Sequence, residues 1–509
     1  MLAKILSSAL SGINAYQVEV EVDIQHGLPA WTTVGLPDTV VKESKDRIRS
    51  AIKNCGYQFP VDKITVNLAP ASQKKEGSSF DLPIALGILA ASGQIKSKRL
   101  KEYMFLGELS LDGHIKPVRG ILPVALLAKK NKLQGVLIPK ANMAEAAVVP
   151  EIKVMPVENL SQVVEFLNGL TAIPQVKINS EEIFKQDQNY EVDFQEVKGQ
   201  AYAKRALEIA AAGGHNVLMI GPPGTGKTML ARRLPTILPP MRFEEALETT
   251  RIYSVAGLLP PGHALVTKRP FRAPHHTISD AGLIGGGQTP RPGEATLAHN
   301  GILFLDELPE FRRNVLEALR QPLEDGIITV ARVGATVSYP ARFMLVCAMN
   351  PCPCGFLGDS RHQCTCSYLQ IQRYRAKVSG PLLDRIDLHI EVPAVNYQDL
   401  SQSAKGESSG EIRKRVEAAR GIQAKRLSKR KVYCNAQMGT KLVNKFCVPD
   451  NAGKTLLETA MERLGLSARA YTRILKIART IADLEAEEKI LPQHIAEAIQ
   501  YRTFDREII

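Results

Sequence analysis

The residues best placed to do chemistry form one glycine-rich run, Gly221-Pro-Pro-Gly-Thr-Gly-Lys-Thr228. It matches the pattern G-x-x-x-x-G-K-[ST] of phosphate-binding loops, and the flanking segments NVLMI and MLARRL supply the strand and helix that this pattern requires. The glycines let backbone N–H groups surround phosphate oxygens, Lys227 can reach the β and γ phosphates, and Thr228 can hold Mg²⁺. The sequence therefore predicts a site for ATP with Mg²⁺ made of Gly221, Pro222, Pro223, Gly224, Thr225, Gly226, Lys227 and Thr228.

Two acidic residues end a later apolar run, Gly301-Ile-Leu-Phe-Leu-Asp-Glu307. At the end of a buried strand, Asp306 can orient the hydration shell of Mg²⁺ and Glu307 can polarise the attacking water. A third apolar run, FMLVCAMN, ends at Asn350, whose amide can report on the γ-phosphate; a turn residue at a strand end is the alternative. A strand ending in Asp-Glu is common by chance, but its position after a phosphate-binding loop predicts hydrolysis of ATP rather than binding alone.

Four cysteines lie close together in the segment CPCGFLGDSRHQCTC, namely Cys352, Cys354, Cys364 and Cys366. Four thiolates can surround a tetrahedral Zn²⁺ if the intervening residues fold back. The Cys-x-Cys pairs depart from the usual Cys-x₂-Cys spacing, so free thiols or a redox pair are alternatives, and His362 can replace one cysteine. We predict structural zinc, because a closed site of four cysteines leaves no position for a reacting water.

Apolar strands that alternate with loops and helices must position these residues. The segments at 216–220, 302–305 and 343–348 are typical of a parallel sheet covered on both faces. We therefore expect an α/β domain that extends over residues 193–394.

Composition changes divide the rest of the 509-residue chain. Residues 1–171 mix alternating segments such as VEVEVDI with helical runs, which indicates a separate mixed domain. Residues 172–192 are polar and poorly periodic, as in a linker, and residues 395–509 have the composition and apolar spacing of an all-helical domain. The predicted fold class is thus α/β and multidomain.

The overall composition limits the class of protein and its surroundings. With 44% apolar and 23% charged residues, the chain is neither disordered nor fibrous. No apolar run approaches the ~18 residues of a membrane span, and Ser and Gly interrupt the opening MLAKILSSALSGINAY too early for a secretory signal. Eight cysteines are too few for a disulfide framework and favour a reducing compartment, so we expect a cytoplasmic protein without a membrane partner.

These motifs resemble the AAA+ ATPase superfamily, and three stretches resemble the ComM/YifB family of magnesium-chelatase-like ATPases. The stretches are GEATLAHNGILFLDELPEF at 293–311, SGPLLDRIDLHIEVP at 379–393 and LGLSARAYTRILKIARTIADLE at 464–485. The similarity covers essentially the whole chain. It implies an AAA+ P-loop α/β core with a C-terminal helical lid.

The resemblance also implies roles for three residues. Asn350 is expected to be sensor 1, Arg385 the finger presented to the nucleotide of a neighbouring subunit, and Arg469 the sensor 2 arginine of the lid. Charge on a transferred phosphoryl group favours an added guanidinium group, which supports the role of Arg385. An ion pair with Asp384 or Asp387 is the alternative. An arginine acting in trans requires head-to-tail contacts, and the family implies a ring of six subunits.

The first domain resembles the α+β, Lon-protease-like (ribosomal S5 domain 2-like) domain of this family. The segment KEGSSFDLP stands where that fold has its serine motif, and FLGELSLDGHIKPV matches the following hairpin. The position of the protease lysine falls at Leu122, so Ser79 lacks the amine base that a Ser-Lys dyad needs. We expect no peptidase activity, although Lys116 or Lys129 would supply an amine in a different register.

Two insertions interrupt the expected ATPase core, TKRPFRAPHHTISDAGLIGGGQ at 267–288 and EDGIITVARVGATVSY at 324–339. The second has the pattern of a β-hairpin with its tip at 332–334, and in the resembled family such insertions line the central pore. The cations expected to contact DNA phosphates there are Lys268, Arg269, Arg272, His275, His276 and Arg332. A solvated or intersubunit surface is the alternative for each.

Charge favours a polyanionic partner. Lys and Arg outnumber Asp and Glu by 65 to 52, and residues 411–431 contain nine basic side chains against two acidic ones, although such a run is most often a solvated face. One Trp and 6% aromatic residues offer little surface for base stacking, so contacts with DNA should be made mainly to its backbone.

Two functions follow. The first is a ring-forming, ATP-driven DNA translocase or helicase, which for the resembled family implies branch migration of recombination intermediates in natural transformation. The second is a protein-remodelling or chelatase-type motor that acts on a protein partner.

Overall fold

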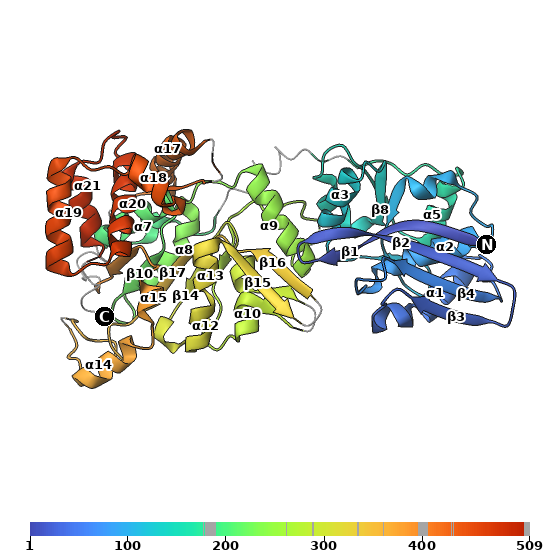
Figure 1. Cartoon of the computed structure of the whole chain (residues 1–509), viewed down its shortest axis with the longest axis horizontal. Coiled ribbons are helices and arrows are strands. Elements are labelled where there is room, and N and C mark those ends of the chain that lie inside the picture. Colours follow the sequence, from blue (N-terminus) through green and yellow to red (C-terminus); the bar gives the residue numbers. More distant parts are fainter. Residues whose placement is uncertain are drawn as a thin grey trace. The chain divides into compact units, whose positions relative to one another are not determined.

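The computed structural model describes the chain except residues 177, 179–189, 261, 288–289, 333–334, 360, 395–405, 429, 431 and 503–509. The chain forms two compact units (Figure 1). Unit 1 comprises Met1–Gln188 and Arg242–Thr267, and unit 2 comprises Asn189–Met241 and Lys268–Ile509. Most of the expected linker at 172–192 lies outside the described residues.

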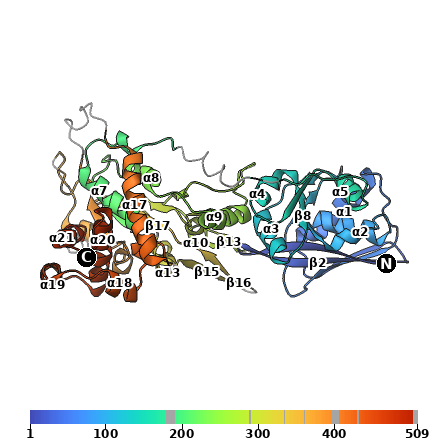
Figure 2. The same ribbon diagram turned by 90° about the horizontal axis from the view of Figure 1, so that it is seen from above.

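The larger sheet of unit 1 follows from strict alternation in its longest strands. Val18, Val20 and Val22 are buried, whereas Glu19 and Glu21 between them point outward and pair with Lys4. The strand order is β1-β2-β4-β3, with β3 parallel to β4 and the other pairs antiparallel. Helices α1 and α2 cover the apolar face (Figure 2).

The elements of unit 1 are β1 Leu2–Ser11, β2 Asn14–Gln25, β3 Ala30–Val34, α1 Thr39–Asn54, β4 Lys63–Ala69, η1 Ser78–Phe80, α2 Asp81–Ala91, η2 Lys98–Lys101, β5 Tyr103–Phe105, β6 Glu108–Leu109, β7 Ile115–Lys116, α3 Ile121–Lys130, β8 Gly135–Pro139, η3 Lys140–Asn142, α4 Met143–Ala147, β9 Lys153–Val157, α5 Leu160–Leu167 and α9 Phe243–Ala256. Strands β5, β8 and β9 form a second, parallel sheet.

Helix α9 belongs to unit 1 although its residues follow the phosphate-binding helix in the chain. It packs against α3, and Ala264 and Leu265 behind it enter the same apolar core. The hydroxyl of Ser254 donates to the buried carboxylate of Glu145, and the backbone N–H of Gly120 donates to Ser254 O at 3.1 Å. The chain therefore passes from unit 2 into unit 1 and back within what the sequence predicted to be one domain.

Unit 2 contains a five-stranded, all-parallel sheet with the order β11-β14-β17-β10-β18. The apolar runs VLMI, ILFL and MLVCAM are buried along their whole length, because helices and loops cover both faces of the sheet. The predicted mixed α/β class with a parallel sheet is confirmed.

The elements of unit 2 are η4 Phe194–Glu196, α7 Ala201–Gly213, β10 Val217–Ile220, α8 Lys227–Ile237, β11 Phe271–Arg272, α10 Asp280–Ile284, β12 Gly285–Gly286, β13 Arg291–Pro292, α11 Glu294–Leu297, β14 Ile302–Leu305, η5 Leu308–Glu310, α12 Arg313–Ala318, α13 Arg320–Asp325, β15 Ile327–Arg332, β16 Ala335–Pro340, β17 Met344–Met349, α14 Tyr368–Arg375, α15 Gly380–Leu383, β18 Leu388–Glu391, α17 Ser409–Leu427, η6 Asn435–Gln437, α18 Thr440–Phe446, α19 Asn451–Leu464, α20 Ala468–Leu484 and α21 Pro492–Gln500.

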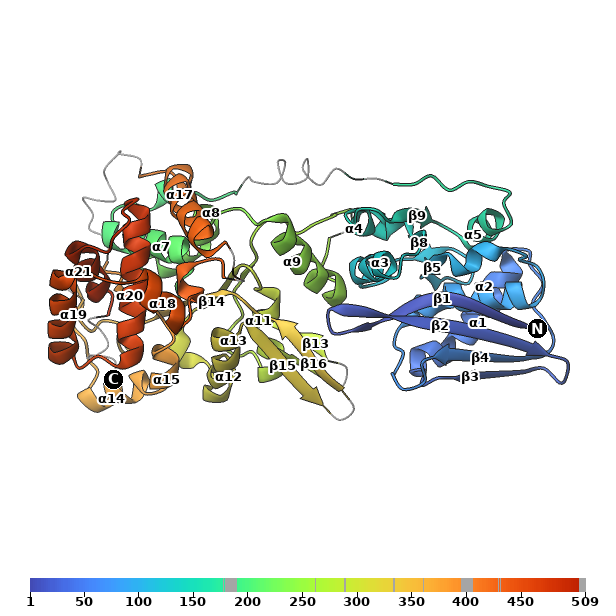
Figure 3. The same cartoon turned by 45° about the horizontal axis from the view of Figure 1, so that its top comes forward.

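The last part of unit 2 is a group of helices. Ser408, Asp450 and Ser467 cap the N-termini of α17, α19 and α20, as short polar side chains do. Helices α18 to α21 lie beside one another (Figure 3), and α17 and α20 pack on α7 of the sheet region. Helices and the sheet thus share one apolar core.

Among the described residues, no helix is long and apolar enough to cross a membrane.

Candidate nucleotide-hydrolysis site

The phosphate-binding loop connects β10 to α8, as the sequence predicts. Gly224 and Gly226 have φ angles of 76° and 90°, a backbone conformation that only glycine adopts without strain. A side chain on Gly221 would come within 2.2 Å of the carbonyl oxygen of Val392. The glycines are therefore needed both for the shape of the loop and for its close packing beside β18.

Lys227 begins helix α8, and its side chain folds back over the loop. Its amino group donates to Gly221 O at 2.6 Å, Pro222 O at 2.8 Å and Asn350 Oδ1 at 3.2 Å. Only 8% of Lys227 is exposed, and this burial lowers the pKa of its amine, with Asp306 acting in the opposite direction. The loop thus holds a desolvated cation where phosphate oxygens are expected.

Thr228 and Asp306 meet at the expected magnesium position. The Thr228 hydroxyl donates to Asp306 Oδ2 at 2.7 Å. Asp306 directly follows β14, and Asn350 directly follows β17, so the carboxyl ends of neighbouring parallel strands deliver these residues to one edge. A hydroxyl and a carboxylate are the hard oxygen donors that Mg²⁺ prefers, so this pair is suited to hold Mg²⁺ or its water ligands.

Glu307 lies on the exposed side of this edge. Its φ angle of 52° turns the chain sharply after Asp306, and 59% of its side chain is exposed. Nδ1 of His276 lies 3.2 Å from Glu307 Oε2. A residue expected to contact DNA is therefore placed against the residue expected to polarise water.

The two expected arginines have different surroundings. Arg385 is 5% exposed and donates to Pro381 O and to the carboxylate of Glu324, while its Nε has no hydrogen-bond partner among the described residues. Arg469 is exposed in the first turn of α20. The Asp384 and Asp387 pairings considered for Arg385 are replaced here by Glu324.

Asp387 instead links the sheet to the helical part. It pairs with Arg473 of α20 and lies 3.4 Å from Nδ1 of the buried His215, whose Nε2 is 2.9 Å from Thr480 Oγ1. Burial alone would raise the pKa of Asp387, but Arg473, His215 and Lys476 lower it below its ordinary value. The sequence pattern did not single out Asp387 or Arg473 for this contact, because it forms between segments far apart in the chain.

Gln200 is a second residue that the sequence analysis missed. Its Nε2 donates to Thr225 O in the phosphate-binding loop at 2.7 Å and to Pro393 O at 3.3 Å. The φ angle of 53° at this residue, just before α7, directs the chain into the helix. The Gly-Gln pair ahead of a helical segment was the only local signal.

Several of the cations expected to contact DNA have partners within unit 2. Arg269 donates to the carbonyl oxygens of Pro239, Pro240 and Asn300, and Arg272 forms a bidentate pair with Glu294. These contacts fix both guanidinium groups within unit 2. That Arg269 and Arg272 contact DNA stays a prediction.

The other expected cations belong to the same two insertions. Lys268 lies 5.9 Å above the ring of Tyr190, and the rings of His275 and His276 are 4.1 Å apart. Arg332 ends β15, which pairs with β16 in the predicted hairpin. The hairpin tip at 333–334, and Gln288 at the end of the first insertion, lie outside the described residues.

The basic run at 411–431 is partly neutralised inside the protein. Arg415 of α17 pairs with Glu208 and Glu407, and Arg426 pairs with Asp483. These partners account for part of the charge that the sequence attributed to solvent or a polyanion.

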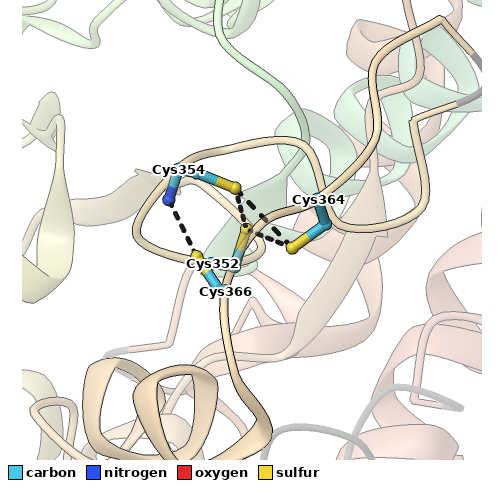
Figure 4. Close-up of side chains that lie close together, drawn as sticks. All are labelled: Cys352, Cys354, Cys364 and Cys366. Atoms are coloured by element: carbon cyan, nitrogen blue, oxygen red, sulfur yellow. Dashed lines mark hydrogen bonds between the residues drawn. The ribbon is translucent and has the colours of Figure 1, made fainter.

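The cysteines come together in one cluster (Figure 4). The ligand atoms of Cys352, Cys354, Cys364 and Cys366 all lie within 4.8 Å of one another. Backbone N–H groups of Phe356 and Thr365 lower the pKa of the Cys354 thiol to about 6. The cluster is compatible with a metal site of four sulfur ligands.

In unit 1, Leu122 is fully buried, and its backbone N–H donates to Glu145 Oε1 at 2.8 Å. Lys129 pairs with Glu151, and the side chain of Lys116 is exposed. Lys75, four residues before Ser79, is buried and donates to Pro70 O. Among the interactions of the described residues, neither Lys116 nor Lys129, the two possible replacement bases, contacts Ser79.

Three family descriptions match successive parts of the chain. Residues 193–400 match "Magnesium chelatase, subunit ChlI", residues 20–142 match "Subunit ChlI of Mg-chelatase" and residues 406–502 match "Magnesium chelatase, subunit ChlI C-terminal". The competence protein ComM of Haemophilus influenzae is 46% identical over 99% of this chain and 98% of its own length. The chain belongs to the ComM/YifB family of magnesium-chelatase-like proteins.

Two further relatives extend the similarity, one from the ComM/YifB family and one from magnesium chelatase. The uncharacterized protein YifB of Escherichia coli is 45% identical over all of this chain and 98% of its own length. The magnesium-chelatase 38 kDa subunit of Rhodobacter capsulatus is more distant, at 28% identity over 39% of this chain and 55% of its own. Membership of this magnesium-chelatase-like AAA+ family implies an ATPase that uses ATP with Mg²⁺.

Proposed function

We propose that the protein is a ring-forming ATPase that moves along DNA and promotes branch migration of recombination intermediates, in the cytoplasm of a cell that takes up DNA. One observation supports the ATPase part of this proposal: the carboxyl ends of the neighbouring strands β14, β17 and β10 lie at one edge of the sheet. Thr228 and Asp306 are joined there at 2.7 Å, and Lys227 and Asn350 at 3.2 Å.

We assign the roles at this edge by the chemistry of each side chain. Backbone N–H groups of the loop and the Lys227 amine bind the β and γ phosphates, and Thr228 and Asp306 hold Mg²⁺, which neutralises developing phosphate charge when bound. Glu307 accepts a proton from the attacking water, and the Asn350 amide contacts the γ-phosphate. For the cysteine cluster we propose Zn²⁺, because every donor is a thiol.

We propose that the site is completed by a second subunit. Lys227 is the one cation that the described edge contributes, so hydrolysis needs further positive charge. Arg385 supplies it to the nucleotide of a neighbouring subunit, and Arg469 supplies it from the helical lid. In unit 2 the buried Arg385 would have to leave Glu324 to act in this way. Head-to-tail contacts of this kind close into a ring, for which we propose six subunits.

The proposal for DNA rests on charge and on kinship. The chain has a formal charge of +13, and its relative in Haemophilus influenzae is named a competence protein. Lys268, His275 and Arg332 are the cations we propose for phosphate contacts. Arg269, Arg272 and His276 form a second group, whose side chains would have to exchange carbonyl or carboxylate partners within unit 2 for phosphates. Unit 1 is proposed to be a Lon-protease-like domain that assists assembly or contacts substrate without peptidase activity.

The test is ATPase turnover with and without single-stranded or four-way-junction DNA over a salt series. Phosphate contacts predict DNA stimulation that falls steeply as salt rises, together with ATP-dependent migration of the junction. Lys227→Ala supplies the control without nucleotide binding.

The relative from Rhodobacter capsulatus, a magnesium-chelatase subunit, supports one alternative, a chelatase-type or protein-remodelling motor that acts on a protein partner. Turnover that is insensitive to every DNA but rises with a protein fraction would favour this alternative and count against the DNA proposal.

A further inference from the structure

We propose that Cys352, Cys354, Cys364 and Cys366 bind one Zn²⁺. The segment that carries them is called the cysteine loop, and we propose that this loop, closed by the ion, holds the phosphate-binding loop and Asn350 in position for ATP. The inference rests on the proposed ATPase function. It adds a link between a metal site and the nucleotide site that lies outside the catalytic residues themselves.

The sulfur atoms already have the spacing of a metal-bound set. Cys352 Sγ lies 3.4 Å from Cys354 Sγ and 3.7 Å from Cys364 Sγ, and the latter two are 3.6 Å apart. A tetrahedron with Zn–S bonds of about 2.3 Å has sulfur–sulfur edges of about 3.8 Å. The fourth cysteine, Cys366, accepts a hydrogen bond from the Cys354 N–H at 3.4 Å, which places its sulfur beside the first pair.

The donor set selects the kind of metal and its role. Thiolates favour Zn²⁺ over Mg²⁺ or Ca²⁺, and four protein ligands leave no open position for a reacting water. The ion would therefore act by closing the loop. Fixing the two Cys-x-Cys segments together removes conformations that the loop would otherwise sample.

The cysteine loop touches the phosphate-binding loop through Gly355. This residue has a φ angle of 87°, and its N–H donates to Cys352 O at 3.1 Å, which closes the turn that contains the first two cysteines. A Cβ added to Gly355 would lie 2.7 Å from Cδ of Pro223 and 3.9 Å from Cγ of Asn350. The backbone at Gly355 thus lies directly against both nucleotide-site segments.

The exit from the cysteine loop touches the same region. Residue 366 leads into α14, where Arg375 Nε donates to Pro351 O at 3.3 Å and the hydroxyl of the buried Tyr374 is hydrogen-bonded to the Asn350 backbone. Asn350 in turn contacts Lys227. Helix α14, which follows the cysteine loop, is therefore held on the backbone of Asn350 and Pro351, where the loop begins.

The experiment compares full-length variants for zinc content and for the Kd of a fluorescent, non-hydrolysable ATP analogue. We expect one zinc per chain in the unaltered protein and in Cys55→Ser, a cysteine of unit 1 outside the cluster. A double variant with Cys364→Ser and Cys366→Ser should lose zinc and bind the analogue about tenfold more weakly or worse. Gly355→Ala should keep zinc but also bind the analogue more weakly, because its side chain displaces Pro223.

Zinc removal from the unaltered protein by a zinc-selective chelator in excess Mg²⁺, followed by zinc return, separates the link from misfolding. Affinity for the analogue should fall and then recover. A protein purified without zinc that also fails to take it up would overturn the metal site. Zinc loss with unchanged affinity would overturn the link, provided that Lys227→Ala abolishes binding; if Lys227→Ala binds normally, the proposed nucleotide site itself is wrong.

Discussion

The amino group of Lys227 lies 3.2 Å from Oδ1 of Asn350, which joins the phosphate-binding loop to the end of the neighbouring strand β17. Both residues follow parallel strands that pair directly, β10 and β17, so the contact depends on the sheet rather than on either loop alone. The same amine also donates to two loop carbonyls. ATP binding must exchange these neutral acceptors for phosphate oxygens.

Lys227→Ala should abolish nucleotide binding, since it removes the only cation of the described edge that contacts the loop. In the unaltered protein, burial lowers the pKa of this amine, and bound phosphate would raise it again. ATP affinity should therefore be constant at neutral pH and fall as pH rises through the lowered value, below the ordinary range of lysine. Calorimetric titration across this range checks both, with Lys454→Ala on exposed α19 as the control; affinity that is flat with pH would contradict the second expectation.

Glu307→Gln should bind ATP normally but hydrolyse it about 100-fold more slowly or worse, because the amide cannot accept the water proton. On the proposed function, the variant should also remain bound to DNA in the presence of ATP. Glu310→Gln is the matched control, because Glu310 is nearby and pairs with Lys377. Steady-state ATPase assays and filter binding measure these effects, and rapid hydrolysis by Glu307→Gln would require another base.

His276→Ala should raise the basal ATPase rate and reduce its stimulation by DNA. The reason is that Nδ1 of His276 lies 3.2 Å from Glu307 Oε2, so that the imidazole competes with the attacking water for this carboxylate oxygen. His275→Ala, which removes the adjacent ring but not this contact, should leave the basal rate unchanged. An unchanged basal rate in His276→Ala would show that the contact does not restrain Glu307.

Arg385→Ala should lose hydrolysis while each subunit still binds ATP, and mixing it with Lys227→Ala should restore some turnover if the arginine acts in trans. Loss of the pair between the buried Arg385 and the half-exposed Glu324 should also lower the melting temperature. Glu324→Gln separates the two effects, since it breaks the same pair but keeps the guanidinium group. Mixed assemblies without any recovered turnover would count against the trans geometry.

Asp387→Asn should destabilise unit 2 by about 2–3 kcal/mol, because it leaves Arg473 and the buried His215 without their carboxylate. The lowered pKa of Asp387 means that its charged form favours folding. This contribution should be present at neutral pH and lost only as pH falls below the ordinary aspartate range. Denaturant unfolding at several pH values measures it, with the neighbouring Asp384→Asn as control; equal stability of both variants would remove Asp387 from this role.

The sequence by itself determined the local parts of the site. Gly221 to Thr228 and the acids at 306–307 belong to short segments whose strand, turn and helix follow from neighbouring residues, so their type and spacing were sufficient to predict them. The parallel sheet was likewise predicted, because a strand buried on both faces must be apolar at every position.

Only the tertiary structure decided which distant segments meet. It placed α9 in unit 1, Gly355 against Pro223, His276 against Glu307 and Glu324 on Arg385. Each contact joins residues whose local sequence carries no periodic or motif signal for the other. Their proximity is fixed by the packing of whole elements, which no single segment encodes.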